Sequence, residues 1–340
     1  MSAIAPALER LQAEIAARSA AFGRPVDVAS LRITDRAGEL PLGEPGLVSP
    51  NGACRLVRAA DGWMAVNLAR EEDRDLIPAW LECGLEGEPW ALIAAHAPGR
   101  TVGALVEAAT LLGLPAGRVG EVEAQTLEAP TITAGAAGAP RRPLRVVDLS
   151  ALWAGPLCGA VLAAAGARVT KVESERRPDP TRTSTPDFFQ RLNGAKAELA
   201  LDLAAPEGQA RLRELIAGAD VLITSVRPRA LPSLGLSVAA VFGENPALTW
   251  VAITGYGWTG PGAQRVAFGD DAAAAGGLVR WTADGEPRFM GDALSDPVTG
   301  LAAASGALRA VAAGGGVIVD AALARCAAGA AALCQPRAAA

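Results

Sequence analysis

A carboxylate at a predicted helix start is the first candidate for chemistry in this sequence. Asp296 directly precedes Pro297, and residues 297–312 have a helical pattern. The free backbone amides and the dipole at such a start would hold a carboxylate ionised and oriented. The same Asp-Pro step is also an ordinary helix cap. Asp296 is therefore a functional carboxylate, a cap, or both.

Few other residues suit acid–base or metal chemistry. The single histidine, His96, lies on a predicted helix beside Pro98, and we expect it to be a helix-terminal residue. One histidine excludes a multi-histidine metal site, and no ligand spacing of carboxylates or thiolates is present, so we expect no metal. Asp270 and Asp271 precede an alanine run. They are candidates for a second functional carboxylate, or for a helix cap and a first-turn acid.

These acids lie in a segment that alternates predicted strands and helices. We expect strands at 144–149, 168–172, 197–201, 221–224, 249–254 and 317–320, and helices near 156–165, 207–217, 236–243 and 297–312. Such alternation is typical of βαβ units. The sequence therefore predicts an α/β fold with a Rossmann-like open parallel sheet, which binds ligands at the carboxyl ends of its strands.

The N-terminal part predicts a small α+β domain. We expect a helix near 3–20, strands at 54–58 and 63–68 joined by a turn at Asp61-Gly62, and helices near 72–82, 88–96 and 101–112. Residues 124–142 are rich in Ala, Gly, Thr and Pro and lack an apolar period, which is typical of a linker. The predicted organisation is a small domain at 1–123, a linker at 124–142 and a large domain at 143–340.

Composition and charge limit the class of protein. The 340 residues include 31 basic and 36 acidic side chains, a net charge of −5, and half of the chain is hydrophobic. Without a basic cluster, a nucleic-acid partner is not expected. No uncharged span is long enough to cross a bilayer, so we expect no membrane partner. The five cysteines form no C-x-x-C pair, and no signal-peptide pattern precedes them, so we expect free thiols and a cytoplasmic location.

The loop after the first strand of the predicted sheet disfavours dinucleotide binding. A G-x-G-x-x-G motif is absent, and Trp153 and Pro156 stand where backbone would have to approach a pyrophosphate. An NAD-dependent oxidoreductase therefore ranks last among the functions considered.

A series of motifs, in order, resembles the family III CoA-transferases of the carnitine and formyl-CoA transferase type. The series comprises RVVDLSALWAGPLCGAVLAAAGARVTKVE (145–173), LNGAK (192–196), LDL (201–203), ADVLITSVRP (219–228), NP (245–246), ITGYGWTGP (253–261), SDPVTG (295–300) and GVIVD (316–320). RLVRAADGW (55–63) and LGLPA (112–116) resemble the small domain of that family. There the small domain follows the large one, so this chain resembles a circularly permuted member.

The resemblance implies covalent chemistry at Asp296. In the family an aspartate carboxylate attacks an acyl-CoA thioester, and an aspartyl-CoA thioester then loads an incoming carboxylic acid. Asp296 matches that aspartate. The implied activity is transfer of CoA between an acyl-CoA and a carboxylic acid, with CoA as substrate and no tightly bound cofactor. Because family members form interlocked homodimers, the resemblance also implies a homodimer.

The resemblance further implies where CoA binds. Arg227 matches a basic position that contacts phosphate, whereas a second basic position is Ser233 here, which Arg229 could replace. Asn193 and Lys196 match the turn on the nucleotide side of the family's CoA site. Arg176 and Arg177, after the second strand, could present a planar fork to phosphate or remain solvated surface charges. The first loop adds three candidates for CoA binding: Ser150, Trp153 and Gly155.

Two alternatives remain open. The related α-methylacyl-CoA racemases pair a histidine with the aspartate. Residues 269–271 hold no histidine, but Asp270 could act as a second carboxylate, so a racemase or isomerase is one alternative. Residues 50–53 contain one glycine where some relatives have a glycine-rich loop over the intermediate. The second alternative is therefore a CoA-binding homologue without catalytic activity.

Overall fold

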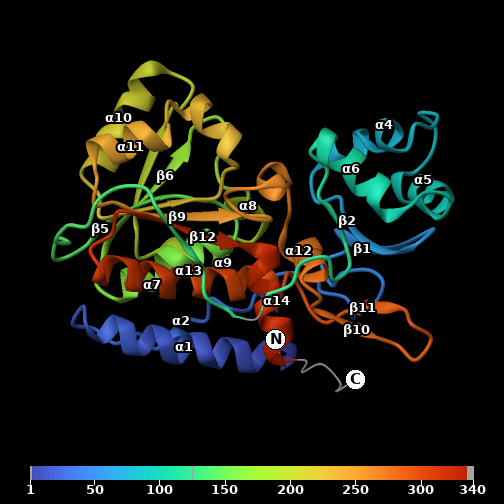
Figure 1. Ribbon diagram of the computed structural model, residues 1–340, viewed down its shortest axis with the longest axis horizontal. Helices are drawn as coiled ribbons and strands as arrows, with labels where there is room; N and C mark the ends of the chain where they lie inside the picture. The colour runs from blue at the N-terminus through green and yellow to red at the C-terminus, as the bar shows by residue number, and fades with distance from the viewer. Residues whose placement is uncertain (1, 125, 335–340) are drawn as a thin grey trace.

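The computed structural model describes residues 2–124 and 126–334 and contains two regions of different architecture (Figure 1). The large region is built on a seven-stranded sheet, and the small region, residues 48–118, on a three-stranded antiparallel sheet. A separate two-stranded sheet joins β10 (Val279–Trp281) and β11 (Pro287–Phe289). Among the described helices, none has the length and apolarity needed to cross a membrane.

The large sheet is parallel except at one edge. In spatial order its strands are β4 (Thr131–Thr133), β12 (Val317–Ala322), β9 (Thr249–Thr254), β8 (Val221–Thr224), β5 (Arg145–Leu149), β6 (Arg168–Ser174) and β7 (Ala197–Leu201). Only β4 runs antiparallel, against β12. The chain runs outward from β5 to β7 and returns on the other side at β8, which makes β5/β8 the switch point where such sheets bind ligands. The predicted α/β fold is confirmed.

Helices cover both faces of this sheet (Figure 1). On one face α10 (Pro206–Ala217) and α11 (Val238–Glu244) bury Leu212, Ile216 and Phe242 against the strands. On the other face lie α7 (Ala154–Ala164), α13 (Ser295–Ala312) and α14 (Leu323–Cys334), with α1 (Ala5–Ala20) beneath them. Because both faces of the sheet are buried, the sequences of its central strands are almost continuously apolar.

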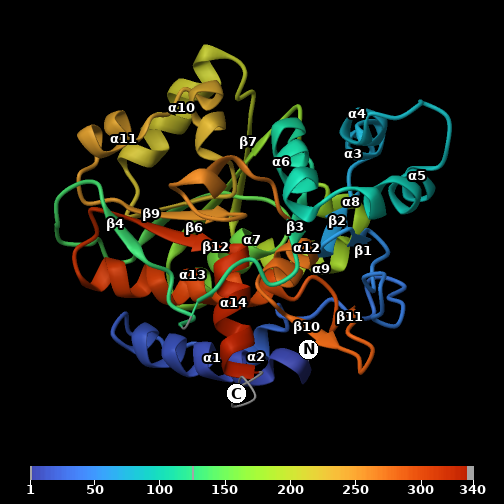
Figure 2. The same ribbon diagram turned by 45° about the vertical axis from the view of Figure 1, so that its right-hand side comes forward.

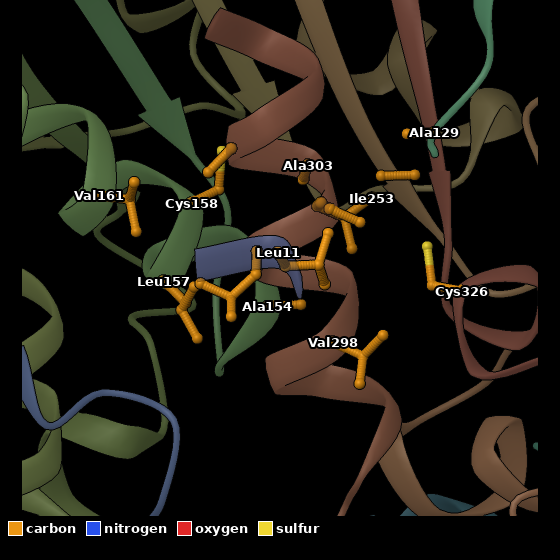
Figure 3. Close-up of a cluster of buried hydrophobic side chains, with 14 of the residues drawn as sticks. Leu11, Ala129, Ala154, Leu157, Cys158, Val161, Ile253, Val298, Ala303 and Cys326 are labelled. Atoms are coloured by element: carbon orange, nitrogen blue, oxygen red, sulfur yellow. The ribbon is translucent and has the colours of Figure 1, made fainter. Parts of the chain in front are cut away.

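Helix α1 packs on the large region, although its sequence position falls in the predicted small domain. Leu8, Leu11 and Ile15 recur at helical spacing and share a core with Leu157 and Val298 (Figure 3). The predicted linker likewise contributes β4 to the edge of the large sheet. The boundaries at 123 and 143 stay a prediction, but the packing places α1 and β4 with the large sheet.

The small region combines one antiparallel sheet with short helices. Its sheet contains β1 (Cys54–Ala59), β2 (Gly62–Asn67) and β3 (Ala116–Arg118). The hairpin between β1 and β2 is present as expected, but its turn is Ala60-Asp61, one residue before the predicted Asp61-Gly62 step, because Gly62 already pairs with Ala59. Its helices are α3 (Glu71–Asp75), α4 (Ile77–Leu81), α5 (Pro89–His96) and α6 (Val102–Leu112). Thr101 Oγ1 accepts the Ala104 N–H at 3.3 Å at the start of α6, and Gly113 ends that helix with a φ of 74°.

Several elements were not predicted. They are α2 (Val28–Leu31), α8 (Thr181–Ser184), α9 (Pro186–Asn193), α14, β3, β4, β10 and β11, whereas α12 (Gly269–Ala275) was one of the two alternatives for the segment at Asp270-Asp271. Helix α12 contacts both the small sheet, at β2 and β3, and the large region, at α13 and α14 (Figure 2). It therefore connects the two regions.

Candidate active site

A cavity of about 690 Å³ opens at the carboxyl ends of the large-sheet strands. Ala151 follows β5, Ser225 follows β8 and Gly255 follows β9, and all three line it. Residues of the small region, Asn51 and Arg70 among them, close the opposite side. The ligand position expected for a doubly wound sheet is therefore hollow and lies between the two regions.

Asp296 lies in this cavity on the first turn of α13. The backbone amide of Ala154, the first residue of α7, lies near its carboxylate and favours the ionised form. Gly269 lies so close that a Cβ there would be 2.1 Å from Asp296 Oδ2. Two helix starts and a close glycine backbone therefore surround the carboxylate.

The charge state of Asp296 differs from the sequence-based expectation. Burial raises its pKa to about 7; the nearby guanidinium of Arg36 and the Ala154 amide lower it, whereas the carboxylates of Asp270 and Asp292 raise it. Burial therefore outweighs the helix amides that were expected to hold the group ionised. A carboxylate with this pKa is more basic than a surface one and is still partly ionised near neutral pH.

Four side chains form a hydrogen-bonded network beside Asp296. Arg36 binds Asp292 with two hydrogen bonds, of 2.6 and 3.0 Å. Asn51 Nδ2 donates to Asp270 Oδ2 at 2.6 Å and to Asp292 Oδ1 at 2.7 Å. Burial, with the charge of Asp292 next in importance, raises the pKa of Asp270 to about 6. The sequence analysis considered Asp270 but missed Arg36, Asn51 and Asp292 as part of the site.

Asp271 has a different role from its neighbour Asp270. Its Oδ1 accepts the backbone N–H of Phe268 at 2.9 Å and the Asn67 amide at 3.1 Å. Burial raises its pKa to about 8. Both acids lie in the first turn of α12, but only Asp270 lines the cavity. Asp271 thus serves as the expected first-turn acid, whereas Asp270 faces the site.

Arg227 is a cation on the cavity wall with no ion pair among the described residues. Its Nη1 donates only to the backbone oxygen of Gln264, at 3.5 Å. Burial and the positive charges of Arg229 and Arg70 lower the pKa of Arg227. Arg70, on the small region, lines the same cavity but is paired with Asp73 at 2.5 Å. Together these arginines make an anion-attracting wall.

Of the three candidate residues on the first loop, two line the cavity and one is buried behind it. Trp153 and Gly155 line the cavity. The Trp153 indole donates to the backbone oxygen of Ile33 at 2.9 Å and meets Phe188 edge-on, with ring centroids 5.1 Å apart. Ser150 is buried, outside the cavity wall, and its hydroxyl donates to Asp148. The structure therefore leaves Ser150 no contact with the cavity.

Lys196 and Asn193 also lie away from the cavity. The Lys196 ammonium donates to Asp148 Oδ2 at 2.7 Å, Pro156 O at 2.8 Å and Asn193 Oδ1 at 2.8 Å. These three bonds use every donor that an ammonium has. A Cβ on Gly159 would lie 2.8 Å from the Lys196 Nζ, so that glycine makes room for the pair. The Lys196 ammonium is thus engaged in a buried ion pair, and the structure does not bring this turn to the cavity.

The arginines after the second strand are surface residues. Arg176 is exposed and pairs with Asp202 at 2.7 Å, and Arg177 is exposed as well. Neither lines the cavity, so the structure does not bring them to Asp296. His96 is likewise exposed, at the end of α5, as expected of a helix-terminal residue. Within residues 2–124 and 126–334, no cluster of three His, Cys, Asp or Glu side chains could hold a metal ion.

Comparison with known proteins points to a single family. The model of CoA-transferase family III matches residues 142–339. A succinyl-CoA–D-citramalate CoA-transferase of Chloroflexus aurantiacus is 35% identical over 184 residues, which cover 51% of this chain and 46% of the relative. The human succinyl-CoA:glutarate CoA-transferase is 32% identical over 194 residues, covering 53% and 44%. The chain spans about half the length of the curated relatives it matches.

Solved structures agree with this result. A CAIB/BAIF family protein from Brucella suis matches with a TM-score of 0.51 at 34% identity, over 56% of this chain and 54% of the other. A hypothetical protein, Rv3272, from Mycobacterium tuberculosis matches with a TM-score of 0.52 at 30% identity, over 58% of each chain. The similarity therefore extends from sequence to fold.

Proposed function

The chain belongs to CoA-transferase family III, and from this premise we propose that it moves CoA from an acyl-CoA to a carboxylic acid with Asp296 as nucleophile. One observation carries the proposal: the Asp296 carboxylate lines the cavity at the start of α13, close to the Gly269 backbone and near the Ala154 amide. The curated relatives, which are named CoA-transferases, support the reaction class.

The first half-reaction loads the enzyme. An Asp296 carboxylate oxygen attacks the thioester carbonyl carbon, the carbon–sulfur bond breaks, and CoA leaves as a thiolate. The thiolate then attacks the Asp296 side-chain carbonyl of the mixed anhydride and displaces the donor acid as a carboxylate. Asp296 now carries CoA as a thioester.

The second half-reaction reverses these steps with another acid. The acceptor carboxylate attacks the aspartyl-CoA thioester and displaces the CoA thiolate. The thiolate then attacks the acceptor carbonyl and releases Asp296 as a carboxylate. Neither half requires a net proton transfer, so the site needs a nucleophile and donors that stabilise negative charge rather than an acid–base pair. The Ala154 amide at the start of α7 is such a donor.

Arg227 is proposed to bind a CoA phosphate, because it is the cavity arginine left without a carboxylate partner in the described part of the chain. Replacing Arg227 by alanine should raise the KM for acyl-CoA about 10- to 100-fold, since a hydrogen bond to a charged group is worth about 1.5–3 kcal/mol. Steady-state kinetics on both variants measures this effect. The matched control is Arg176→Ala, an exposed arginine outside the cavity. If Arg176→Ala raised KM more than Arg227→Ala, the phosphate assignment would be wrong.

Covalent loading should depend on pH. The charged groups that face Asp296 are Arg36, Asp270 and Asp292, and the pKa of Asp296 is raised to about 7. Only the ionised carboxylate attacks, so the rate of adduct formation should rise as pH increases through about 7 and level off above it. Rapid-quench measurements at saturating acyl-CoA test this. A profile that stays level from about pH 5 upward would mean an ordinary carboxylate pKa.

A second candidate function is α-proton exchange on an acyl-CoA. Asp270 favours it, because this second carboxylate with a raised pKa lines the same cavity. An assay in deuterated water, with a panel of acyl-CoAs and acceptor acids, distinguishes the two functions. Transfer yields the acceptor thioester without deuterium, whereas exchange places deuterium on the α-carbon. CoA binding without either product would indicate an inactive homologue. The homodimer and the cytoplasmic location are part of the same proposal and rest on the family resemblance and the sequence features.

A further inference from the structure

The cavity wall opposite α7 includes the loop that precedes β1, and Asn51 is its central residue. Asn51 Oδ1 accepts hydrogen bonds from Ser49 Oγ at 3.0 Å and from the Ala53 N–H at 2.9 Å. Its Nδ2 donates to Asp270 and Asp292, as described above. Two donors and two acceptors are the full capacity of an asparagine side chain. The loop therefore fixes the orientation of this amide.

The two carboxylates that Asn51 bridges hold the turn leading into α13. Asp270 Oδ1 accepts the backbone N–H of Ala293 at 2.7 Å, and Ala293 O accepts the N–H of Asp296 at 2.9 Å. Ala293 has a φ of 45°, the left-handed region, which costs a residue with a Cβ about 1 kcal/mol or more. Because this turn is strained, contacts from outside must hold it. Asn51 is bound to the side chains that supply them.

We propose that Asn51 is a positioning residue for Asp296, and that the small region thereby completes the active site within a single chain. Asn51 acts through Asp270 and Asp292, which orient the turn before the nucleophile and contribute negative charge beside it. The inference rests on the proposed role of Asp296 as the residue that carries CoA.

Further contacts hold the small region on α12 of its own chain. Buried Asn67, at the end of β2, binds buried Asp271. Just beyond the small region, the backbone N–H groups of Gly120 and Val122 donate to the carbonyls of Ala274 and Ala275 at 2.9 and 3.0 Å. One apolar cluster also spans the two regions: Cys54, Leu56, Ala65, Ala274, Val279 and Phe289. Asn51 and Asp296 of one chain are therefore brought together by buried contacts of that chain.

Asn51→Ala and Asn51→Asp test the positioning role. Asn51→Ala frees the turn, and we expect covalent loading by acyl-CoA to slow about 10²-fold, because a small displacement of a reacting group has an effect of that size. Asn51→Asp adds a carboxylate beside Asp270 and Asp292. It should move the pH midpoint of loading upward by about one unit, since added negative charge disfavours ionisation of Asp296.

The matched control is Asn67→Ala, which removes the same kind of amide donor from the other acid of α12. It should lower the melting temperature as Asn51→Ala does but leave the pH midpoint of loading in place. If Asn51→Asp left the midpoint at the wild-type value, or Asn67→Ala moved it equally, the positioning role would be refuted. Failure of the proposed function is distinguishable, because the wild-type chain itself would then carry no CoA.

Mixed assemblies test the single-chain site. Asp296→Asn and Asn51→Ala chains, carrying different tags, are co-expressed and purified through both tags. We expect the mixed assemblies to bind no more CoA covalently than the two single variants do when measured separately, because neither chain holds both Asn51 and Asp296. Active wild-type monomers, seen by light scattering with loading measured at the same concentration, would support the same conclusion. Recovery of about a quarter or more of wild-type loading in the mixed assemblies would show that the small region serves a partner chain.

Discussion

Replacing Asp296 by asparagine is expected to abolish CoA transfer and covalent loading together. Asparagine keeps the shape of the side chain but removes the nucleophilic oxygen, and loss of a covalent nucleophile lowers rates about 10³-fold or more. Both quantities should fall to background, as measured by product formation and by the mass of the protein after exposure to acyl-CoA. Asp296→Glu is the companion variant, because it keeps an ionisable carboxyl but displaces it.

The same substitution should not destabilise the fold. The pKa of Asp296 is about 7 in the folded protein and near 4 in the unfolded chain. Ionisation of Asp296 therefore lowers the free energy of unfolding as pH rises above about 4, and this loss reaches its full size above about pH 7. Asparagine removes this cost. Asp296→Asn should therefore unfold at an equal or higher urea concentration than the wild type at pH 8. A large loss of stability would mean that the carboxylate acts mainly as a helix cap.

Replacing Lys196 by methionine should destabilise the protein by about 3–5 kcal/mol, because it leaves the Asp148 carboxylate buried without its charge partner. The backbone oxygen of Pro156 and the side-chain oxygen of Asn193 lose a donor as well. Urea unfolding at neutral pH measures the loss. The double variant Lys196→Met/Asp148→Asn should recover much of it, because the uncompensated charge is gone.

The KM for acyl-CoA distinguishes this structural role from a role in CoA binding. Folded Lys196→Met protein should bind acyl-CoA with an almost unchanged KM, since the ammonium lies outside the cavity. A variant with wild-type stability and a KM raised tenfold would contradict the structure and restore the sequence-based interpretation.

The elements of the fold with a clear apolar period were predictable. The alternating strands and amphipathic helices of the large sheet agree with the structure within a few residues, as do the hairpin and α6 of the small region. Helices α12 and α14 are alanine-rich and buried on several sides, so their sequences carry little amphipathic signal. Strand β4 has three residues in a segment of linker composition.

Site residues could be predicted from the sequence only where they belong to a recognisable motif. Asp296 could be identified from the motif around it. Arg36 and Asn51 could not, because they lie more than 200 residues from their partners and only the packing of the N-terminal part of the chain against the large region brings them together. Residue type also misled at Lys196, since a lysine in a turn reads the same whether its ammonium meets a ligand or a buried carboxylate. The pKa of Asp296 followed from burial, which a sequence does not show.

Intact-protein mass after mixing with a panel of acyl-CoAs, in the absence of any acceptor acid, tests the central claim most directly. We predict a mass increase equal to bound CoA with at least one donor. It should be lost on hydroxylamine treatment, map to Asp296 and be absent from Asp296→Asn. Measurable CoA binding with no adduct from any donor, or an adduct on another residue, would contradict the proposal that Asp296 carries CoA.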